Sequence, residues 1–378
     1  MKYRKLGNNN DLISVIGYGT MRFPVLNKDP SKIDESTAIE QLRYGIDSGI
    51  NYIDTAYGYH MGNSEIVVGK ALKDGYREKV FLADKLPTWL IKEPSDMDKY
   101  LDEQLEKLDT DYIDFYLIHT LDRKKWDNCL NNGLFEFIDR AKKSGKIKQI
   151  GFSFHDEISV FKEIIDKYSW DFCQIQLNLM DEDFQAGLEG LKYAGKNNID
   201  VIIMEPLRGG TLANNVPENI DKIWKSLGKN RTAAAWAFHY LWDYKEVSTV
   251  LSGMNSLKQI DENVAEASDS EVNSLTKEEH EAMSAVKEIY KSRKLIDCTK
   301  CNYCMPCPNG VDIPGCFEVY NDANIYNNLE YYKDQYDGFI SEEEKASNCI
   351  ECGLCEEACP QHLPIMELLK KVDSKLGE

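Results

Sequence analysis

The feature that most constrains the fold is an alternation between short apolar runs and segments of helical periodicity. Apolar runs of strand length occur at 15–20, 51–56, 80–85, 112–118, 147–153, 172–177, 200–205 and 247–252. A helical pattern follows each, the first from Thr37 to Ser48. The runs are nearly continuous in apolar residues, as is typical of parallel strands covered by helices. Eight such units in about 255 residues predict an α/β fold, a (β/α)8 or TIM barrel.

A doubly wound parallel sheet is the alternative fold for such an alternation. The turn after the first apolar run reads Gly-Tyr-Gly-Thr (17–20) and lacks the Gly-x-Gly-x-x-Gly fingerprint of that fold's dinucleotide site. The barrel is therefore the favoured fold for the first part of the chain.

Eight of the eleven cysteines fall into two short runs near the end of the sequence. The runs are Cys298, Cys301, Cys304 and Cys307, then Cys349, Cys352, Cys355 and Cys359, each followed by a proline. A thiolate at every third position lets one loop offer three soft ligands to a compact centre. In bacterial ferredoxins the fourth cysteine of each run then binds the other run's cluster.

This spacing predicts two 4Fe-4S clusters. The first is expected on Cys298, Cys301, Cys304 and Cys359, and the second on Cys349, Cys352, Cys355 and Cys307. The first run is one residue shorter than the ferredoxin pattern, which leaves the partner of Cys307 open. Structural zinc is the alternative, but it would leave each run's third cysteine without a role. The remaining Cys129, Cys173 and Cys316 are expected to be small buried hydrophobes.

The chain therefore divides into a large part and a small one. We predict a barrel domain over 1–275, a polar helical connector over 276–295, and a small, mostly α-helical dicluster ferredoxin-type domain over 296–378. The Tyr-rich and acidic segment between the cysteine runs, 321–345, is expected to form short helices.

The charge balance excludes some partners. The chain has 45 Lys and Arg against 64 Asp and Glu, a formal charge of −19. A field of this sign repels phosphates, so we expect neither nucleic acid nor a membrane as a partner. It would favour a basic redox partner protein over an acidic one. With no secretion signal and no apolar stretch of roughly 18 residues, we expect a cytoplasmic protein, whose oligomeric state the sequence does not specify.

Four polar residues lie at or just after the ends of predicted barrel strands, where the active site of such a barrel lies. They are Asp54, Tyr59, Lys85 and His119. Each has a structural explanation taken alone: a cap, a loop contact, a solvated strand end and a core histidine.

Together these four residues form a chemically consistent set. A partly buried Lys85 needs a carboxylate such as Asp54 to stay charged. Its ammonium would lower the pKa of Tyr59 from about 10 and let the phenol act as general acid towards a carbonyl oxygen, which His119 would orient.

At this point the sequence resembles the aldo-keto reductase family over roughly residues 1 to 267. The resemblance rests on Gly-Tyr-Gly-Thr-Met (17–21), Gly-Ile-Asn-Tyr-Ile-Asp-Thr-Ala-Tyr-Gly-Tyr (49–59), Gly-Asn-Ser-Glu (62–65), Phe-Leu-Ala-Asp-Lys (81–85), Asp-Phe-Tyr-Leu-Ile-His (114–119), Ile-Gly-Phe-Ser-Phe-His (150–155), Gln-Ile-Gln-Leu-Asn (174–178), Glu-Pro-Leu (205–207) and Asp-Glu-Asn (261–263). The family's catalytic tetrad falls on Asp54, Tyr59, Lys85 and His119.

The resemblance implies a barrel that binds NADP or NAD in an extended pose and reduces a small-molecule carbonyl substrate. The implied cofactor-binding residues are Gly19, Thr20, Met21, Ser153, Gln174, Leu207, Gly253 and Asn263. Of these, Ser153 and Gln174 would meet the nicotinamide amide.

The chain departs from the family pattern at several of these places. Met204 stands where many relatives place an aromatic residue against nicotinamide, and Phe154 with His155 replaces the asparagine that follows the serine. Gly253 and Gln259 replace the cations that grip a 2′-phosphate, which makes NADH a candidate cofactor beside NADPH, although Lys258 or Arg208 could supply charge.

The last 80 or so residues resemble the 4Fe-4S extension of a microbial subgroup of the same family. Three functions follow as hypotheses. The chain is a carbonyl reductase whose clusters serve structure or redox sensing, an enzyme whose clusters exchange electrons with an external partner, or a redox-responsive binding module without turnover. The complete tetrad argues against the third.

Overall fold

Eight of the ten strands in the part of the chain that the structure describes close into a parallel barrel, in the order β10-β3-β4-β5-β6-β7-β8-β9. The structure is a computed structural model that describes residues 1–7 and 11–377. The barrel strands are β3 (Ile16–Gly19), β4 (Tyr52–Asp54), β5 (Phe81–Leu86), β6 (Ile113–Leu121), β7 (Ile147–Phe154), β8 (Phe172–Gln176), β9 (Asp200–Met204) and β10 (Val247–Ser252). All eight coincide with predicted strands to within three residues at either end, which confirms the predicted (β/α)8 fold.

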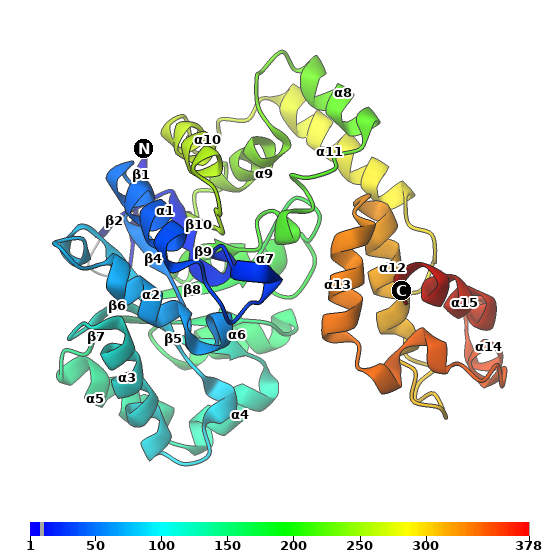
Figure 1. The fold of residues 1–378 in the computed structure, drawn as a ribbon, viewed down its shortest axis with the longest axis horizontal. Helices are drawn as coiled ribbons and strands as arrows, with labels where there is room; N and C mark the ends of the chain where they lie inside the picture. Colours follow the sequence, from blue (N-terminus) through cyan, green and yellow to red (C-terminus); the bar gives the residue numbers. More distant parts are fainter. Residues whose placement is uncertain (8–10, 378) are drawn as a thin grey trace. The chain divides into compact units, whose positions relative to one another are not determined.

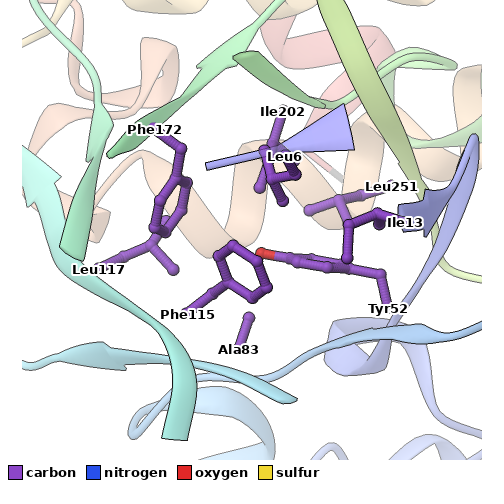
Figure 2. Packing of buried hydrophobic residues seen from close by; sticks show 9 residues of the cluster. All are labelled: Leu6, Ile13, Tyr52, Ala83, Phe115, Leu117, Phe172, Ile202 and Leu251. Carbon is purple, nitrogen blue, oxygen red and sulfur yellow. The ribbon is translucent and has the colours of Figure 1, made fainter. Parts of the chain in front are cut away.

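Two further strands form a hairpin that the sequence pattern does not predict. Strands β1 (Tyr3–Leu6) and β2 (Asp11–Ser14) pair antiparallel, with Leu6 opposite Asp11. Their side chains Leu6 and Ile13 are fully buried and pack with residues of the barrel strands, among them Tyr52 and Phe115 (Figure 2). Because these strand residues belong to a single apolar cluster, the hairpin extends the barrel core.

Helices follow the barrel strands and cover their outer faces. They are α1 (Glu35–Asp47), α2 (Ser64–Ala71), α3 (Ser95–Leu108), α4 (Arg123–Asn131), α5 (Leu134–Lys143), α6 (Ile158–Lys167), α7 (Gly187–Lys196), α9 (Ala233–Trp242) and α10 (Leu257–Ser268). Helix α2 lies unusually close to α3, because a Cβ on Gly69 would meet the Leu108 carbonyl oxygen at 2.7 Å. A glycine is required there, and the close contact brings Glu65 of α2 near the residues of α3.

The chain divides into two compact units, and each unit combines two separate stretches of the sequence. The division expected from sequence has consecutive ranges instead. The first unit comprises Met1–Pro206 and Ala235–Leu275, and the second comprises Leu207–Ala234 and Thr276–Glu378. The segment after β9 thus belongs to the second unit. The reason is helix packing, since α8 (Glu218–Ser226) contacts α11 (Lys277–Ser292).

The second unit is mainly helical. Beside α8 and α11 it contains α12 (Ile313–Ile325), α13 (Leu329–Phe339), α14 (Leu354–Ala358) and α15 (Ile365–Leu376), drawn in orange and red in Figure 1. Arg208 is tied into this unit by a 2.7 Å ion pair with Asp322 and by its position over the Tyr326 ring. Within the described residues, no helix has the length and apolar character needed to cross a membrane.

Candidate active site and cysteine cavity

Lys85 and Asp54 form a buried ion pair at the carboxyl ends of β5 and β4. The Lys85 Nζ donates to Asp54 Oδ1 at 2.7 Å, and it is fully buried while Asp54 is 3% exposed. The same ammonium donates to the Thr55 carbonyl oxygen at 2.7 Å. Register places the two residues together, because Asp54 pairs with Ala83 and Lys85 is the next inward-facing position of β5.

Tyr59 lies in the short 3-10 helix Tyr59–Gly62 that follows β4. Its hydroxyl accepts a hydrogen bond from Lys85 Nζ at 3.2 Å, and the ammonium lies 4.7 Å from the ring centre. The next residue, His60, fixes this turn, since its ring nitrogens lie 2.9 Å from the Pro30 carbonyl oxygen and 3.2 Å from that of Thr20. The phenol and the ammonium are therefore held in direct contact.

His119 lies near the end of β6, with its ring 6.1 Å from that of Tyr59 in an edge-on arrangement. The His119 side chain is buried and its Nδ1 has no hydrogen-bond partner among the described residues. The structure thus brings all four residues of the predicted tetrad into one site. It also adds Trp89, which is 46% exposed and 5.4 Å from the His119 ring. The only sequence signal for Trp89 is an aromatic residue just after the strand that carries Lys85.

The ionisation of the site follows from burial and from the lysine charge. Burial acts to lower the pKa of Lys85, but Asp54 and Tyr59 outweigh it and leave the pKa above its ordinary value. Burial raises the pKa of Tyr59 by more than the Lys85 ammonium lowers it. The expectation that Lys85 would bring the phenol's pKa down is therefore wrong, because desolvation of the phenolate dominates, and Tyr59 remains protonated at neutral pH.

The ionisation of His119 is opposite to that of Lys85. Burial, followed by the nearby Lys85 charge, holds the pKa of His119 well below its ordinary 6.5. The imidazole is therefore neutral at neutral pH, and it can donate a hydrogen bond to a carbonyl oxygen without adding a positive charge.

Ser153 and Gln174, predicted to meet a nicotinamide amide, are register partners on β7 and β8. Both are buried, and the Gln174 Oε1 has no donor among the described residues. Ser153 Oγ accepts a 2.7 Å bond from the Thr120 backbone N–H, which leaves the serine hydroxyl hydrogen free to donate. A carboxamide offers both an N–H and a carbonyl oxygen, so these two groups fit it.

The predicted contacts at Gly19, Thr20 and Met21 lie at the end of β3 and in the turn that follows. Thr20 is fully buried and its hydroxyl is hydrogen-bonded to Ser64 at 2.8 Å, so its side chain serves the turn. Met21 is 56% exposed. Backbone atoms and the Met21 side chain are what this turn offers to a ligand.

Gly253 and Asn263 lie at the end of β10 and in α10, and Leu207 belongs to the second unit. Asn263 is bonded through Nδ2 to Ser252 Oγ at 3.2 Å. The side chain of Arg22 covers Gly253, where an added Cβ would meet it at 2.9 Å.

Two residues that depart from the family pattern have partners within the protein. The Gln259 Oε1 accepts a hydrogen bond from the Asn255 backbone N–H. The Met204 Sδ lies 3.5 Å from Gln174 Nε2.

The second unit contains a cavity lined by four cysteines. Its lining includes Cys298, Cys301, Cys304 and Cys359, together with apolar residues such as Ile313 and Phe317. The Lys300 backbone N–H donates to Cys298 Sγ at 3.4 Å. Two sequence-distant segments thus contribute four cysteine residues to the lining of one cavity, and these are the four predicted for one cluster. No three metal-binding side chains among the described residues are arranged to hold a single ion.

The other four predicted ligands are brought near one another less directly. Asn309, two residues after Cys307, donates through Nδ2 to the Asn348 carbonyl oxygen at 2.5 Å, just before Cys349. Burial raises the pKa of Cys355 to about 11, and the neighbouring Cys349 adds to this. Cys352 is exposed. Cys129, Cys173 and Cys316 are fully buried, as expected of structural cysteines.

Comparison with known proteins agrees with this geometry. The aldo/keto reductase family matches residues 15–288, and a 4Fe-4S dicluster domain matches residues 297–363. A parallel eight-stranded barrel that this family model matches is that of an oxidoreductase. The chain belongs to the aldo/keto reductase family and carries a 4Fe-4S dicluster domain after the barrel.

Curated relatives include the NADH-specific methylglyoxal reductase of Escherichia coli (strain K12). It is 27% identical over 310 residues, covering 70% of this chain and 93% of that protein. The L-galactose dehydrogenase of Arabidopsis thaliana is 27% identical over 315 residues, covering 77% of this chain and 96% of that protein.

Solved structures show the same barrel. The holo form of an aldo-keto reductase from Bacillus halodurans has a TM-score of 0.62 at 25% identity and covers 75% of this chain and 96% of its own. An aldo/keto reductase of Klebsiella pneumoniae in complex with NADP and acetate has a TM-score of 0.62 at 22% identity, covering 76% and 96%.

Proposed function

We propose that this enzyme reduces an aldehyde or ketone with NADH or NADPH, and that Tyr59 is the general acid. The observation that carries the proposal is the buried Lys85 ammonium, which is bonded to Asp54 and to the Tyr59 hydroxyl at once. A protonated phenol with an adjacent cation is suited to give a proton to an oxygen that gains negative charge.

When bound, the nicotinamide cofactor supplies a hydride to the carbonyl carbon. Tyr59 Oη donates its proton to the carbonyl oxygen. Lys85, 3.2 Å away, stabilises the phenolate that remains, and Asp54 keeps the lysine charged. Neutral His119 donates a hydrogen bond that orients the carbonyl.

Two buried groups support a nicotinamide site beside this tetrad. Gln174 Oε1 would accept the carboxamide N–H, and the Ser153 hydroxyl would donate to the carboxamide oxygen. The two cations that could bind a 2′-phosphate both have carboxylate partners, since Arg208 is paired with Asp322 at 2.7 Å and Lys258 with Glu262 at 3.6 Å. This supports NADH as an alternative to NADPH.

We also propose that the cysteines hold two 4Fe-4S clusters, one on Cys298, Cys301, Cys304 and Cys359 and one on Cys349, Cys352, Cys355 and Cys307. The cavity lined by the first set supports the exchange of fourth ligands between the runs. The 2.5 Å bond from Asn309 to Asn348 supports the placement of Cys307 beside the second run.

The experiment is to follow NADH and NADPH oxidation with a panel of aldehydes and ketones, with the clusters intact and after their removal. Turnover that survives cluster removal supports a reductase with structural or sensing clusters. Turnover that requires clusters and an added electron acceptor supports exchange with a redox partner. If no carbonyl or electron acceptor supports turnover, the result would favour the alternative function, a redox-responsive binding module.

A further inference from the structure

Two acidic side chains with no exposed surface lie behind the strand that carries Lys85. Asp84 precedes Lys85 on β5, so its side chain points to the opposite face of the strand, towards the outer helices. Glu65 comes from α2, and both residues are 0% exposed. The proposed reduction gives neither residue a role.

Asp84 is bonded to the backbone of the catalytic lysine. Its Oδ1 accepts the Lys85 backbone N–H at 2.8 Å, and its Oδ2 accepts Gln104 Nε2 at 2.7 Å. The Gln104 Nε2 also donates to the Lys85 carbonyl oxygen at 3.0 Å. Both backbone polar groups of Lys85 are thus held by Asp84 and Gln104.

Only one of the two carboxylate oxygens of Glu65 is bonded to a cation among the described residues. Its Oε2 accepts Lys107 Nζ at 2.7 Å, whereas its Oε1 is buried and has no N–H or hydroxyl donor among the described residues. The Asp84 carboxyl and the Gln104 amide both lie within hydrogen-bonding range of the Glu65 carboxyl.

The hydrogens available between Asp84 and Glu65 indicate whether one of the two carboxyls is protonated. A Gln side chain has two N–H groups, and Gln104 gives them to Asp84 and to the Lys85 carbonyl. The Gln104 Oε1 is occupied by the Tyr116 hydroxyl at 2.6 Å. Two ionised carboxylates contain no hydrogen to share, so a bond between Asp84 and Glu65 requires a proton on one of them.

The proton is expected on Asp84. Burial, followed by the neighbouring Glu65, raises the pKa of Asp84 well above its ordinary value. Burial raises the pKa of Glu65 as well, but the Lys107 ammonium at 2.7 Å opposes this rise and favours the ionised carboxylate, a counter-charge that Asp84 has less directly.

We propose that Asp84 and Glu65 share one buried proton, and that the neutral Asp84 acid is a positioning residue for Lys85. The role of Lys85 rests on the proposed function. The neutral acid holds the Lys85 backbone without adding a second negative charge near the ammonium. Asp54 then remains the carboxylate that sets the charge of Lys85 and, through it, the proton donation by Tyr59.

The direct test is infrared spectroscopy of the full-length protein without substrate, in H2O and in D2O, at neutral pH. We expect a C=O stretching band of a protonated carboxylic acid that shifts in D2O and is lost in Asp84→Asn. The control Asp98→Asn, at an exposed ion pair with Arg140, should leave this band unchanged. Identical wild-type and Asp84→Asn spectra in this region would overturn the proposal.

Kinetics test the positioning role separately. An amide at position 84 can still accept the Lys85 N–H through Oδ1 and donate to Glu65 through Nδ2, and it loses only the bond accepted from Gln104. Asp84→Asn should therefore keep kcat within about threefold of wild type. Asp84→Leu, which removes the bonds, should lower kcat by about tenfold or more with little change in KM. A folded Asp84→Asn enzyme that loses as much kcat as Asp84→Leu would overturn the proposal.

The two readouts also separate this inference from the proposed function. A wild-type protein that shows the acid band but reduces no carbonyl would refute the reductase assignment alone. If Asp84→Leu does not fold, the infrared comparison on Asp84→Asn still decides whether the proton is present.

Discussion

Lys85 Nζ lies 2.7 Å from Asp54 Oδ1 at the carboxyl end of the barrel, and neither side chain is more than 3% exposed. A buried ammonium needs such a partner, because desolvation otherwise favours the neutral amine. The same ammonium contacts the Tyr59 hydroxyl, so one ion pair fixes both the charge and the geometry of the proposed proton donor.

Asp54→Asn should destabilise the fold by about 3–5 kcal/mol, because it leaves the Lys85 charge buried without a counter-ion. Urea unfolding measures the loss. The control is Asp47→Asn at the exposed pair with Lys79, which should cost about 1 kcal/mol or less. Adding Lys85→Met to Asp54→Asn should recover stability, and a double variant less stable than Asp54→Asn would contradict this reading.

The stability of the protein should fall as pH drops below 6.5, in part through His119. The folded-state pKa of His119 is depressed by burial, so below 6.5 the unfolded chain binds a proton that the folded chain does not. Unfolding free energies measured over this range should decline less steeply in His119→Gln. Equal slopes in wild type and His119→Gln would exclude this contribution.

The alkaline limb of the pH–rate profile should lie above pH 10, because burial raises the pKa of Tyr59 above that ordinary value. A general acid works while it is protonated, so kcat/KM should stay flat across neutral pH. Initial rates at saturating cofactor measure the profile. A limb near neutrality that disappears in Tyr59→Phe would show that Lys85 outweighs burial after all.

Cys359→Ser should lose about four irons per chain if the first cavity holds one of two clusters. Anaerobic iron and sulfide counts with the visible spectrum measure this. Cys316→Ser is the matched control, since Cys316 is fully buried and does not line the cavity of the first set. Full iron in Cys359→Ser, or zinc in place of iron in the wild type, would contradict the cluster assignment.

Removal of residues 276–378 should yield an aggregating protein. Helix α8 buries Ile220 and Trp224 in the second unit and contacts α11, which the deletion removes. Exposed apolar surface of this kind promotes association. Size-exclusion chromatography of the shortened chain checks this, and a monomer with native barrel stability would show that the predicted boundary at residue 275 separates two independent domains.

The sequence pattern predicted the barrel and the tetrad because both depend on local signals. Continuous apolar runs mark parallel strands, and polar residues at their ends, such as Lys85 and His119, mark the active face. The pattern did not reveal the Asp84–Glu65 contact, because burial of Asp84 depends on how α2 and α3 pack. It also did not reveal that the segment from Leu207 joins the second unit, since that depends on a contact between α8 and α11.

The most direct test of the central claim is the rate of NADH or NADPH oxidation with an aldehyde in Tyr59→Phe, compared with Tyr57→Phe. Tyr57 lies two residues earlier and donates to Glu103 at 3.0 Å, so it controls for loss of a phenol in the same loop. We expect Tyr59→Phe to lose about 10²-fold or more in turnover with cofactor affinity nearly intact, and Tyr57→Phe to stay close to wild type. Unchanged turnover in Tyr59→Phe would contradict the assignment of Tyr59 as the proton donor.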